Sequence, residues 1–218
     1  MDNKLAEIFF NGLSIINIKL DAAQILKFDV YINELLIWNK KINLIGPASA
    51  EKIIVNHFID SLSVAGVVKS VHSGRSDARL IDVGTGAGFP GLPLKIYMKE
   101  IQLTLVDSTA KKAEFLRHLC RKMDIKAEVL NERAENVAKM STYAAGFDIA
   151  LARAVAKPPS LKKLCFPLLK NGGFLVLQVS SKTASGMEDK DIIMKTGLPE
   201  NILPGRSIIV IRKPDLTD

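Results

Sequence analysis

Apolar residues recur at helical spacing along the first 70 or so positions, and no strand pattern is found there. The clearest helix is predicted from Asp21 to Lys41, with one broad apolar side formed by Ile25, Phe28, Ile32, Leu35, Leu36 and Trp38. Gly46-Pro47 interrupts this pattern, and Ser49 is placed to cap a second helix that continues to Ala65. We therefore expect residues 1–70 to form an N-terminal helical extension.

Beyond a polar turn at 71–77, short apolar runs alternate with helical segments. Strands are predicted at residues 80–83, 101–106, 127–130, 147–152, 174–179 and 207–212. Helices are predicted over 108–123, from Pro158 to Gly172-Gly173, and around Glu188–Lys195. This alternation is typical of a mostly parallel sheet, and the short linker before the last strand favours an antiparallel edge pairing. Residues 71–218 are thus predicted to form one α/β domain.

Composition narrows the class of protein and its partners. The 218 residues carry a net charge of +7, which favours an anionic partner, nucleic acid above all. No apolar run reaches the ~20 residues that span a bilayer, and the N-terminus lacks a signal-peptide pattern, so we expect a cytoplasmic protein without a membrane partner. Cys120 and Cys165 are isolated and are predicted to be buried thiols, and we expect no metal.

The most informative stretch runs from Leu80 to Gly91. A short apolar strand, Leu80–Val83, is followed by a loop with Gly84, Gly86 and Gly88, and then by the start of a helix. Glycines let the backbone approach a ligand closely, and a helix start offers unpaired N–H groups. The arrangement therefore predicts a cofactor-binding loop.

Two cofactor classes compete for this loop. A nicotinamide enzyme would use the G-x-G-x-x-G of Gly86 to Gly91, but this match lies out of register with the end of the strand. Asp82 with Gly84, Gly86 and Gly88 instead forms the D-x-G-x-G-x-G of S-adenosylmethionine (SAM) methyltransferases, whose cofactor carries positive charges that a carboxylate attracts. Asp107, about 20 residues further on, is predicted to hold ribose hydroxyls, and capping the next helix is a compatible alternative.

Two polar groups have both a structural and a functional interpretation. His57, Asp60 and Ser61 interrupt an apolar helix, either as a polar network that docks the helix or as part of the site. The helix over 108–123 carries Lys111, Lys112, Arg117, Arg121 and Lys122, which form either a solvated face or a phosphate-binding surface.

Together these segments resemble one family, RsmG, also called glucose-inhibited division protein B. The matching motifs are Trp38–Leu44, His57–Leu62, Asp82–Pro93, Leu105–Ser108, Lys111–Leu116, Arg133–Glu135, Ala152–Ala156 and Arg206–Lys213. They extend over nearly the whole chain, and several are specific to this family rather than to methyltransferases in general.

The resemblance implies a Rossmann-like class I SAM-dependent methyltransferase, with a mostly parallel seven-stranded sheet, an antiparallel edge strand and the N-terminal helical extension. It implies methylation of N7 of a single guanine in 16S ribosomal RNA, with the RNA or the small ribosomal subunit as partner, and we expect a monomer. Because N7 presents a lone pair, no general base is required.

The resemblance also assigns residues. Asp82 and the loop at Gly84, Gly86, Gly88 and Phe89 would contact SAM, with Asp107 and Ser108 on the ribose side and Ala134 and Glu135 on the adenine side. Arg153 would lie by the methionine part and the guanine, as the positioning residue of catalysis. RNA contacts are expected from Lys111, Lys112, Arg133, His57 and Lys182.

Two positions depart from the family pattern, and two rival functions remain. Asn56 stands where the family usually has arginine, and Gln178-Val179 stands where it usually has Lys-Gly. Both departures remove positive charge, and Lys182 is the nearby residue expected to compensate. One rival is an oxidoreductase, favoured by Asp107 and opposed by Asp82 and the glycine register. The other is a non-catalytic RNA-binding protein, favoured by the two lost charges and opposed by the complete cofactor loop.

Overall fold

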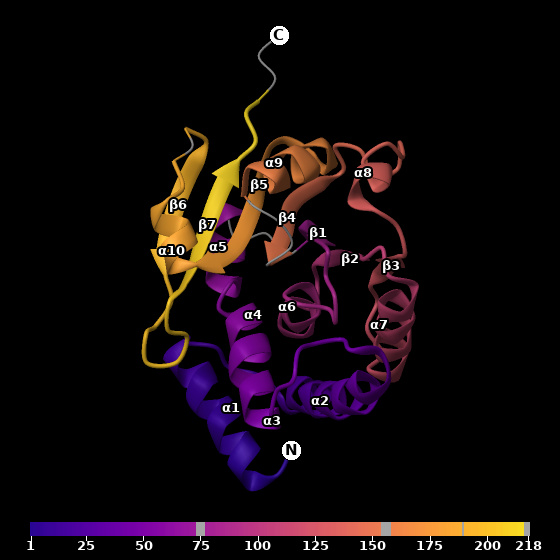
Figure 1. Ribbon diagram of the computed structural model, residues 1–218, viewed down its shortest axis with the longest axis vertical. Helices are drawn as coiled ribbons and strands as arrows, with labels where there is room; N and C mark the ends of the chain where they lie inside the picture. Colours follow the sequence, from indigo (N-terminus) through magenta and orange to yellow (C-terminus); the bar gives the residue numbers. More distant parts are fainter. Residues whose placement is uncertain (73–76, 154–157, 189, 216–218) are drawn as a thin grey trace.

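The computed structural model describes residues 1–72, 77–153, 158–188 and 190–215 (Figure 1). Part of the predicted turn at 71–77, the motif residues Ala154–Ala156 and Asp189 lie outside these ranges. The N-terminal segment is helical, as predicted. Its elements are α1 (Asn3–Ile15), α2 (Ala22–Ile42), α3 (Ala50–Ile53), the π-helix η1 (Ile54–Ile59), α4 (Asp60–Leu62) and α5 (Ala65–Val71).

Local capping explains where the first helices begin. Asp21 and Gln24 form a reciprocal capping box at the start of α2. The Ser49 side chain accepts a hydrogen bond from the Lys52 backbone N–H, which confirms the predicted cap of the second helix. The helical run Ala50–Val71 is long and apolar enough to be weighed as a membrane span, but 61% of its most apolar window is buried, as in a helix of a protein core.

A seven-stranded sheet forms the centre of the molecule. Its strands are β1 (Arg79–Val83), β2 (Gln102–Val106), β3 (Glu128–Leu130), β4 (Phe147–Arg153), β5 (Leu169–Ser180), β6 (Ile192–Gly197) and β7 (Arg206–Arg212). They lie in the order β3-β2-β1-β4-β5-β7-β6. The first five strands pair in parallel, whereas β7 is antiparallel to both β5 and β6. The predicted mostly parallel sheet is confirmed, and the carboxyl ends of β1, β2, β4 and β5 share one edge.

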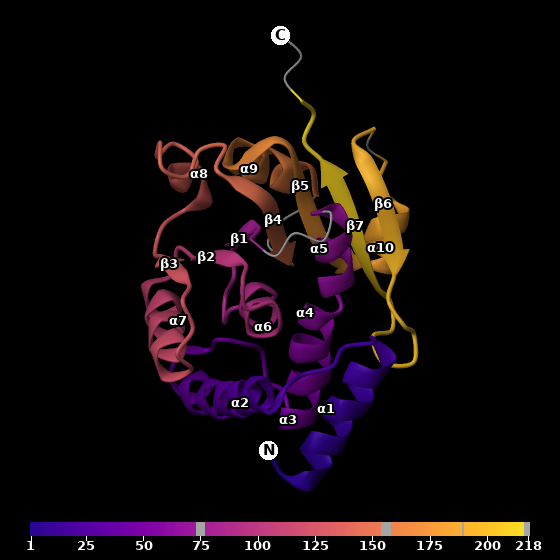
Figure 2. The same ribbon diagram turned by 180° about the vertical axis from the view of Figure 1, so that it is seen from behind.

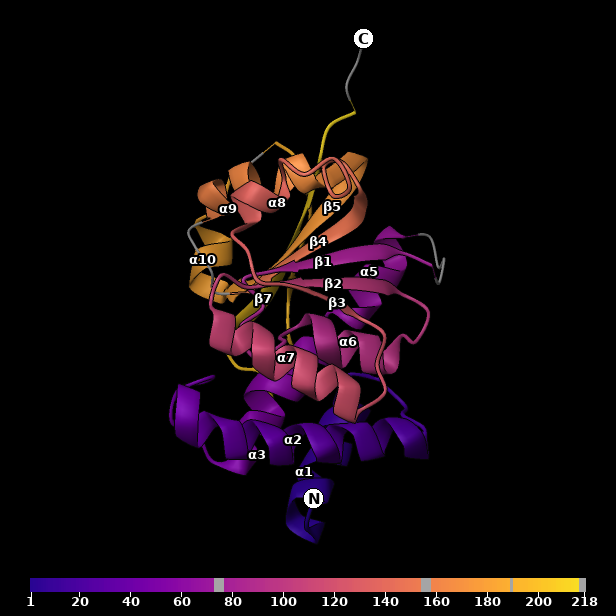
Figure 3. The ribbon, with the colours of Figure 1, turned by 90° about the vertical axis from the view of Figure 1, so that its right-hand side faces the viewer.

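Helices cover both faces of this sheet (Figure 3). The remaining helices are α6 (Gly91–Tyr97), α7 (Ala110–Lys122), α8 (Ala134–Val137), α9 (Pro158–Cys165), the 3-10 helix η2 (Phe166–Leu168) and α10 (Ser181–Ser185). In Figure 3, α6 and α7 lie on one face, with α1, α2 and α3 as a further layer beyond them, and α8 and α9 lie on the other. Figure 2 shows from behind that α1, α2 and α3 gather at the end of the molecule opposite the C-terminus.

Successive strand residues feed two separate cores. Leu80 and Leu105 point into the larger core under the N-terminal helices, whereas Ile81 and Val106 point into the smaller core under α9. This alternation is the period of two expected of a strand buried on both faces. Cys120 and Cys165 are free and buried, as predicted.

Three sequence predictions about the C-terminal third were wrong. The segment around Glu188–Lys195 is not helical: Ile192–Gly197 forms β6, whose residues alternate in burial because only one face packs on the protein. The predicted antiparallel edge strand is present, but it is β6 rather than the last strand, and β7 is its inner neighbour. The helix that begins at Pro158 ends at Cys165, and Gly172-Gly173 lies inside β5, next to a register shift in the β4–β5 pairing.

Candidate active site

The glycine loop leaves β1 in the conformation that its sequence predicts. Gly84, Gly86 and Gly88 have φ angles of 68°, 60° and 103°, in the left-handed region that side chains disfavour. The backbone N–H groups of Gly88 and Phe89 both donate to the Thr85 carbonyl oxygen, which closes the turn. The loop therefore places backbone, not side chains, at the carboxyl end of β1.

Asp82 lies under this loop and is completely buried. Its Oδ2 accepts hydrogen bonds from Thr85 Oγ1 at 2.7 Å and from the Gly91 backbone N–H at 2.8 Å. Its Oδ1 has no hydrogen-bond partner among the described residues. Burial raises the pKa of Asp82 to about 6, and the two hydrogen bonds only partly oppose that shift. The carboxylate thus fixes the loop and keeps one oxygen unsatisfied.

Asp107 holds the loop from the side of β2. Its Oδ2 accepts from the Gly86 N–H at 3.0 Å, and its Oδ1 accepts from the Thr109 N–H at 2.9 Å. Thr109 is the N-cap of α7, so Asp107 supports the helix start from two residues before it. Both oxygens are therefore engaged with backbone, while the ribose contact stays a prediction.

A pocket of about 220 Å³ opens where these elements meet. Its walls are Val83, Gly84, Val106, Asp107, Ser108, Glu132, Arg133, Ala134, Glu135 and Leu164. The structure thus brings together the predicted ribose side, the predicted adenine side and the first loop glycine. Gly86, Gly88 and Phe89 lie in the adjoining loop rather than in the walls. Glu132 and Leu164 are wall residues that the sequence motifs did not indicate.

Arg153, the last residue of β4, is fixed by the N-terminal helices. Its Nη1 donates to Asp60 Oδ2 at 2.9 Å and to the Asn56 carbonyl oxygen at 3.1 Å, and its Nη2 lies 2.7 Å from His57 Nδ1. Its guanidinium carbon lies 5.2 Å from the centre of the Phe89 ring. His57 and Asp60 therefore form a docking network on a predicted site residue, whereas the buried Ser61 Oγ has no hydrogen-bond partner among the described residues.

His57 and Asp60 are three residues apart on the helical run, so their side chains lie on one side of it and reach the same guanidinium. Burial, with the charges of Arg153 and Arg206, lowers the pKa of His57 to about 3, so the ring is neutral near pH 7. A neutral ring offers no charge to a phosphate, and its Nδ1 is already used by Arg153.

The other predicted RNA-contacting residues flank the site without touching one another. Lys111 is exposed in the first turn of α7, and the Lys112 ammonium lies 3.9 Å from Asp107 Oδ2. Arg133 is the N-cap of α8 and lines the pocket. Lys182 is exposed on α10, which follows the carboxyl end of β5. These residues border the same sheet edge from opposite sides.

The two departures from the family pattern differ in their surroundings. Asn56 is exposed, and its backbone oxygen binds Arg153. Gln178 is only 4% exposed, and its Nε2 donates to the Asp60 carbonyl oxygen at 2.6 Å. Gln178 therefore docks α4 on β5 and is directed away from solvent.

A larger cavity, of about 350 Å³, lies between α2 and α6. It is lined by Lys27, Lys95, Lys99 and Lys126 among others and contains none of the predicted site residues. The smaller pocket is the better candidate because it adjoins the glycine loop and both acids. Within the described ranges, no three His, Cys, Asp or Glu side chains cluster to hold a metal ion.

Comparison with known proteins agrees with this geometry. The family model for rRNA small subunit methyltransferase G, GidB, matches residues 24–203. Ribosomal RNA small subunit methyltransferase G of Desulfitobacterium hafniense is 40% identical over 84% of this chain and 74% of its own length. The protein of that name from Acetivibrio thermocellus is 37% identical over 96% of this chain and 89% of its own length.

A solved structure from Listeria monocytogenes, described as a candidate class I S-adenosylmethionine-dependent methyltransferase, shares the fold. It superposes with a TM-score of 0.63 at 16% identity, over 88% of this chain and 70% of the other. The fold is thus that of class I methyltransferases, and the sequence relatives show which family of them the chain matches. With a family model that spans most of its length, the chain belongs to the rRNA small subunit methyltransferase G family, a family of SAM-dependent methyltransferases.

Proposed function

We propose that this protein transfers a methyl group from S-adenosylmethionine to N7 of a single guanine in 16S ribosomal RNA. The observation that carries this proposal is the pocket at the carboxyl ends of β1 and β2. There the glycine loop, Asp107 and the Arg133–Glu135 segment converge, as a nucleoside cofactor in an open α/β sheet requires. A ribosomal substrate implies that the protein acts in the bacterial cytoplasm, and we retain the monomer as a prediction.

The chemistry of the pocket fits this cofactor. Asp107 and Ser108 would face the ribose, and Ala134 and Glu135 the adenine, with backbone of Gly84, Gly86, Gly88 and Phe89 along the rest of the cofactor. When bound, SAM supplies an electrophilic methyl group on a positively charged sulfur. Asp82 would supply the matching negative charge beneath the loop, because a nearby cation favours the ionised form of a buried carboxyl. A pyrophosphate, as in nicotinamide cofactors, would instead be repelled.

The proposed mechanism needs alignment rather than proton transfer. Guanine N7 holds a free lone pair, so no side chain has to remove a proton before attack. Arg153, held by Asp60, His57 and the Asn56 carbonyl, would place the base against the methyl group. Holding two reactants in line can contribute up to roughly 7–11 kcal/mol. The Asp60 carboxylate also offsets the Arg153 charge, so the purine becomes cationic without facing an unpaired cation.

RNA recognition would use the basic residues around the same edge. We propose phosphate contacts for Lys111, Lys112, Arg133 and Lys182, and a positioning role for the neutral His57. The target base has to leave its stack to reach the pocket edge, as in other enzymes that modify bases.

The test is transfer of labelled methyl groups from SAM to small ribosomal subunits of a strain that lacks this gene, with naked 16S RNA as a second substrate. The expected product is one N7-methylguanine, lost in an Asp107→Ala variant that no longer binds SAM. A modified base of another kind would refute the N7 assignment. Bound SAM without transfer to either substrate would favour the non-catalytic rival, and binding of NADH in place of SAM would favour the oxidoreductase.

A further inference from the structure

Tyr31 connects the N-terminal helices to the cofactor loop. It lies on α2 and is fully buried, 56 residues before the loop residue that it contacts. Its hydroxyl donates to the Ala87 carbonyl oxygen at 2.6 Å. Burial raises the pKa of Tyr31 well above its ordinary value, so the hydroxyl keeps its proton and remains a donor.

The hydroxyl and the loop meet at contact distance. A Cβ added at Gly88 would lie 2.6 Å from the Tyr31 hydroxyl oxygen, closer than any side chain tolerates. On the other side, Asp107 accepts the Gly86 N–H. Residues 86–88 are therefore held between Asp107, the residue after β2, and a hydroxyl from α2, so the shape of the loop depends on both.

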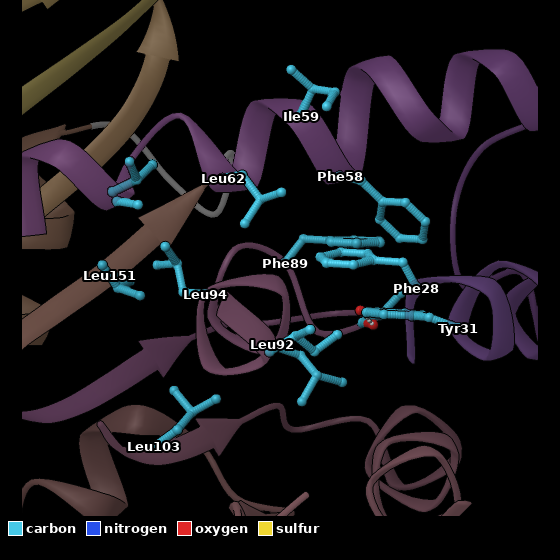
Figure 4. Close-up of a cluster of buried hydrophobic side chains, with 14 of the residues drawn as sticks. Phe28, Tyr31, Phe58, Ile59, Leu62, Phe89, Leu92, Leu94, Leu103 and Leu151 are labelled. Carbon is cyan, nitrogen blue, oxygen red and sulfur yellow. Dashed lines mark hydrogen bonds between the residues drawn. The ribbon is translucent and has the colours of Figure 1, made fainter. Parts of the chain in front are cut away.

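The Tyr31 ring extends this contact toward Arg153. It stacks on Phe89 with 5.4 Å between ring centres and 2° between planes. Phe89 in turn lies 4.8 Å from the His57 ring and 5.2 Å from the Arg153 guanidinium carbon. Figure 4 shows Tyr31, Phe28, Phe58 and Phe89 gathered where α2 meets the helix that carries Phe58. One side chain of the helical extension thus contacts the loop directly and Arg153 through one ring.

We propose that Tyr31 is a positioning residue of the methyl-transfer site. Its hydroxyl holds the glycine loop in the shape that binds the cofactor, and its ring holds Phe89 as the surface on which Arg153 rests. This inference rests on the proposed function, because it assigns the loop to SAM and Arg153 to the target base. It makes the N-terminal helices a working part of the site.

A second contact of α2 provides a matched control. Gln24 Nε2 donates to the carbonyl oxygens of Ile96 and Tyr97 at 2.8 and 3.0 Å, so it docks the same helix on α6 without touching the loop. Both Gln24 and Tyr31 are buried side chains that donate to backbone carbonyls. Removing either one should cost stability, but only Tyr31 should affect the cofactor.

The experiment compares Tyr31→Phe, Tyr31→Leu and Gln24→Met by calorimetric SAM binding, steady-state kinetics and thermal unfolding. Tyr31→Phe should raise the Kd and KM for SAM about five- to tenfold, the size of one buried hydrogen bond, and leave the KM for ribosomal subunits unchanged. Tyr31→Leu, which also removes the ring, should in addition lower kcat at saturating SAM. Gln24→Met should lower Tm and leave SAM binding as in the wild type.

Each outcome separates this inference from the proposed function. If the wild-type protein does not bind SAM, the proposed function fails and the role of Tyr31 fails with it. If the wild type binds SAM and Tyr31→Phe binds it equally well, only the inference is refuted. It is also refuted if Gln24→Met weakens SAM binding as much as Tyr31→Phe does at equal loss of Tm, since the effect is then one of stability alone.

Discussion

At the scale of single residues, burial of the Asp82 carboxyl lowers the stability of the free protein when the carboxyl is ionised. Its pKa of about 6 lies above the ordinary value of 3.8, mainly because the carboxyl is completely buried. Between these two values the native state binds more protons than the unfolded chain. Stability from this group is therefore present below the ordinary pKa and falls as pH rises through about 6. Because the ionised Asp82 destabilises the free protein, we expect its charge to act when the cofactor is bound.

We expect Asp82→Asn to stabilise the free protein and to weaken SAM binding. About two pKa units correspond to ~3 kcal/mol of stability gained near pH 8, a gain that should vanish near pH 4. The amide keeps the size of the carboxyl but carries no charge for the cofactor. Urea unfolding at the two pH values and calorimetric SAM titration measure both effects. Lower stability near pH 8, or unchanged SAM affinity, would contradict this account of Asp82.

At the scale of single elements, α7 carries cations at both ends of its helix dipole. Its first turn holds Lys111 and Lys112 and no acidic residue, although cations are disfavoured at a helix N-terminus. Asp107, 3.9 Å from the Lys112 ammonium, offsets one of these charges, and an anion that binds there would offset the other. Arg121, in the last turn, is a cation in its favoured place, ten residues or about 15 Å along the helix axis.

We expect Lys111→Ala to reduce the dependence of RNA binding on salt, with a slope of log affinity against log salt that is smaller by about one. The matched variant Arg121→Ala removes the same charge from the other end of α7 and should leave the slope unchanged. Filter binding of ribosomal subunits over a range of salt concentrations measures both. Equal effects of the two variants would mean that α7 acts only through the overall charge of the protein.

Elements differ in how far the sequence determines them. The apolar runs of β1, β2, β4 and β7 were predicted within one or two residues, because strands buried on both faces are continuous apolar segments. The edge strand β6 was predicted as a helix, since its charged neighbours resemble a solvated helix and its pairing with β7 is a tertiary contact. Local patterns thus locate the continuous apolar strands and the short β3, whereas they miss β6 and the first residues of β5.

The residues of the candidate site also differ in how far the sequence predicts them. Asp82, Asp107 and the glycines follow from spacing, and the structure brings them together as expected. The sequence did not predict the contacts of Tyr31 and Gln178, because their partners lie 56 and 118 residues away in the chain, respectively. The contact between His57 and Arg153 likewise joins residues that are 96 positions apart in the chain.

At the scale of the whole molecule, the N-terminal helices share a core with the sheet. One apolar cluster joins Phe9, Phe28 and Leu35 of the extension to Leu92 and Phe115 of the sheet-bearing part. Trp38, the one tryptophan of the sequence, packs on Phe115 and on His118 of α7, at 5.6 and 5.3 Å between ring centres. Its fluorescence therefore reports the contact between the two predicted domains.

We expect the chain to unfold in one transition, so that Trp38 fluorescence and far-ultraviolet circular dichroism give the same midpoint. SAM at 100 times its Kd should add about 2.7 kcal/mol and shift both signals together, although Trp38 lies outside the pocket. A fluorescence transition that precedes the dichroism, or one that SAM leaves in place, would mean that residues 1–70 unfold on their own. Coincident shifts would instead mean that α2, η1 and the cofactor loop unfold as one cooperative unit. This is the result expected from the contacts that Tyr31 of α2 and His57 of η1 both make with Phe89.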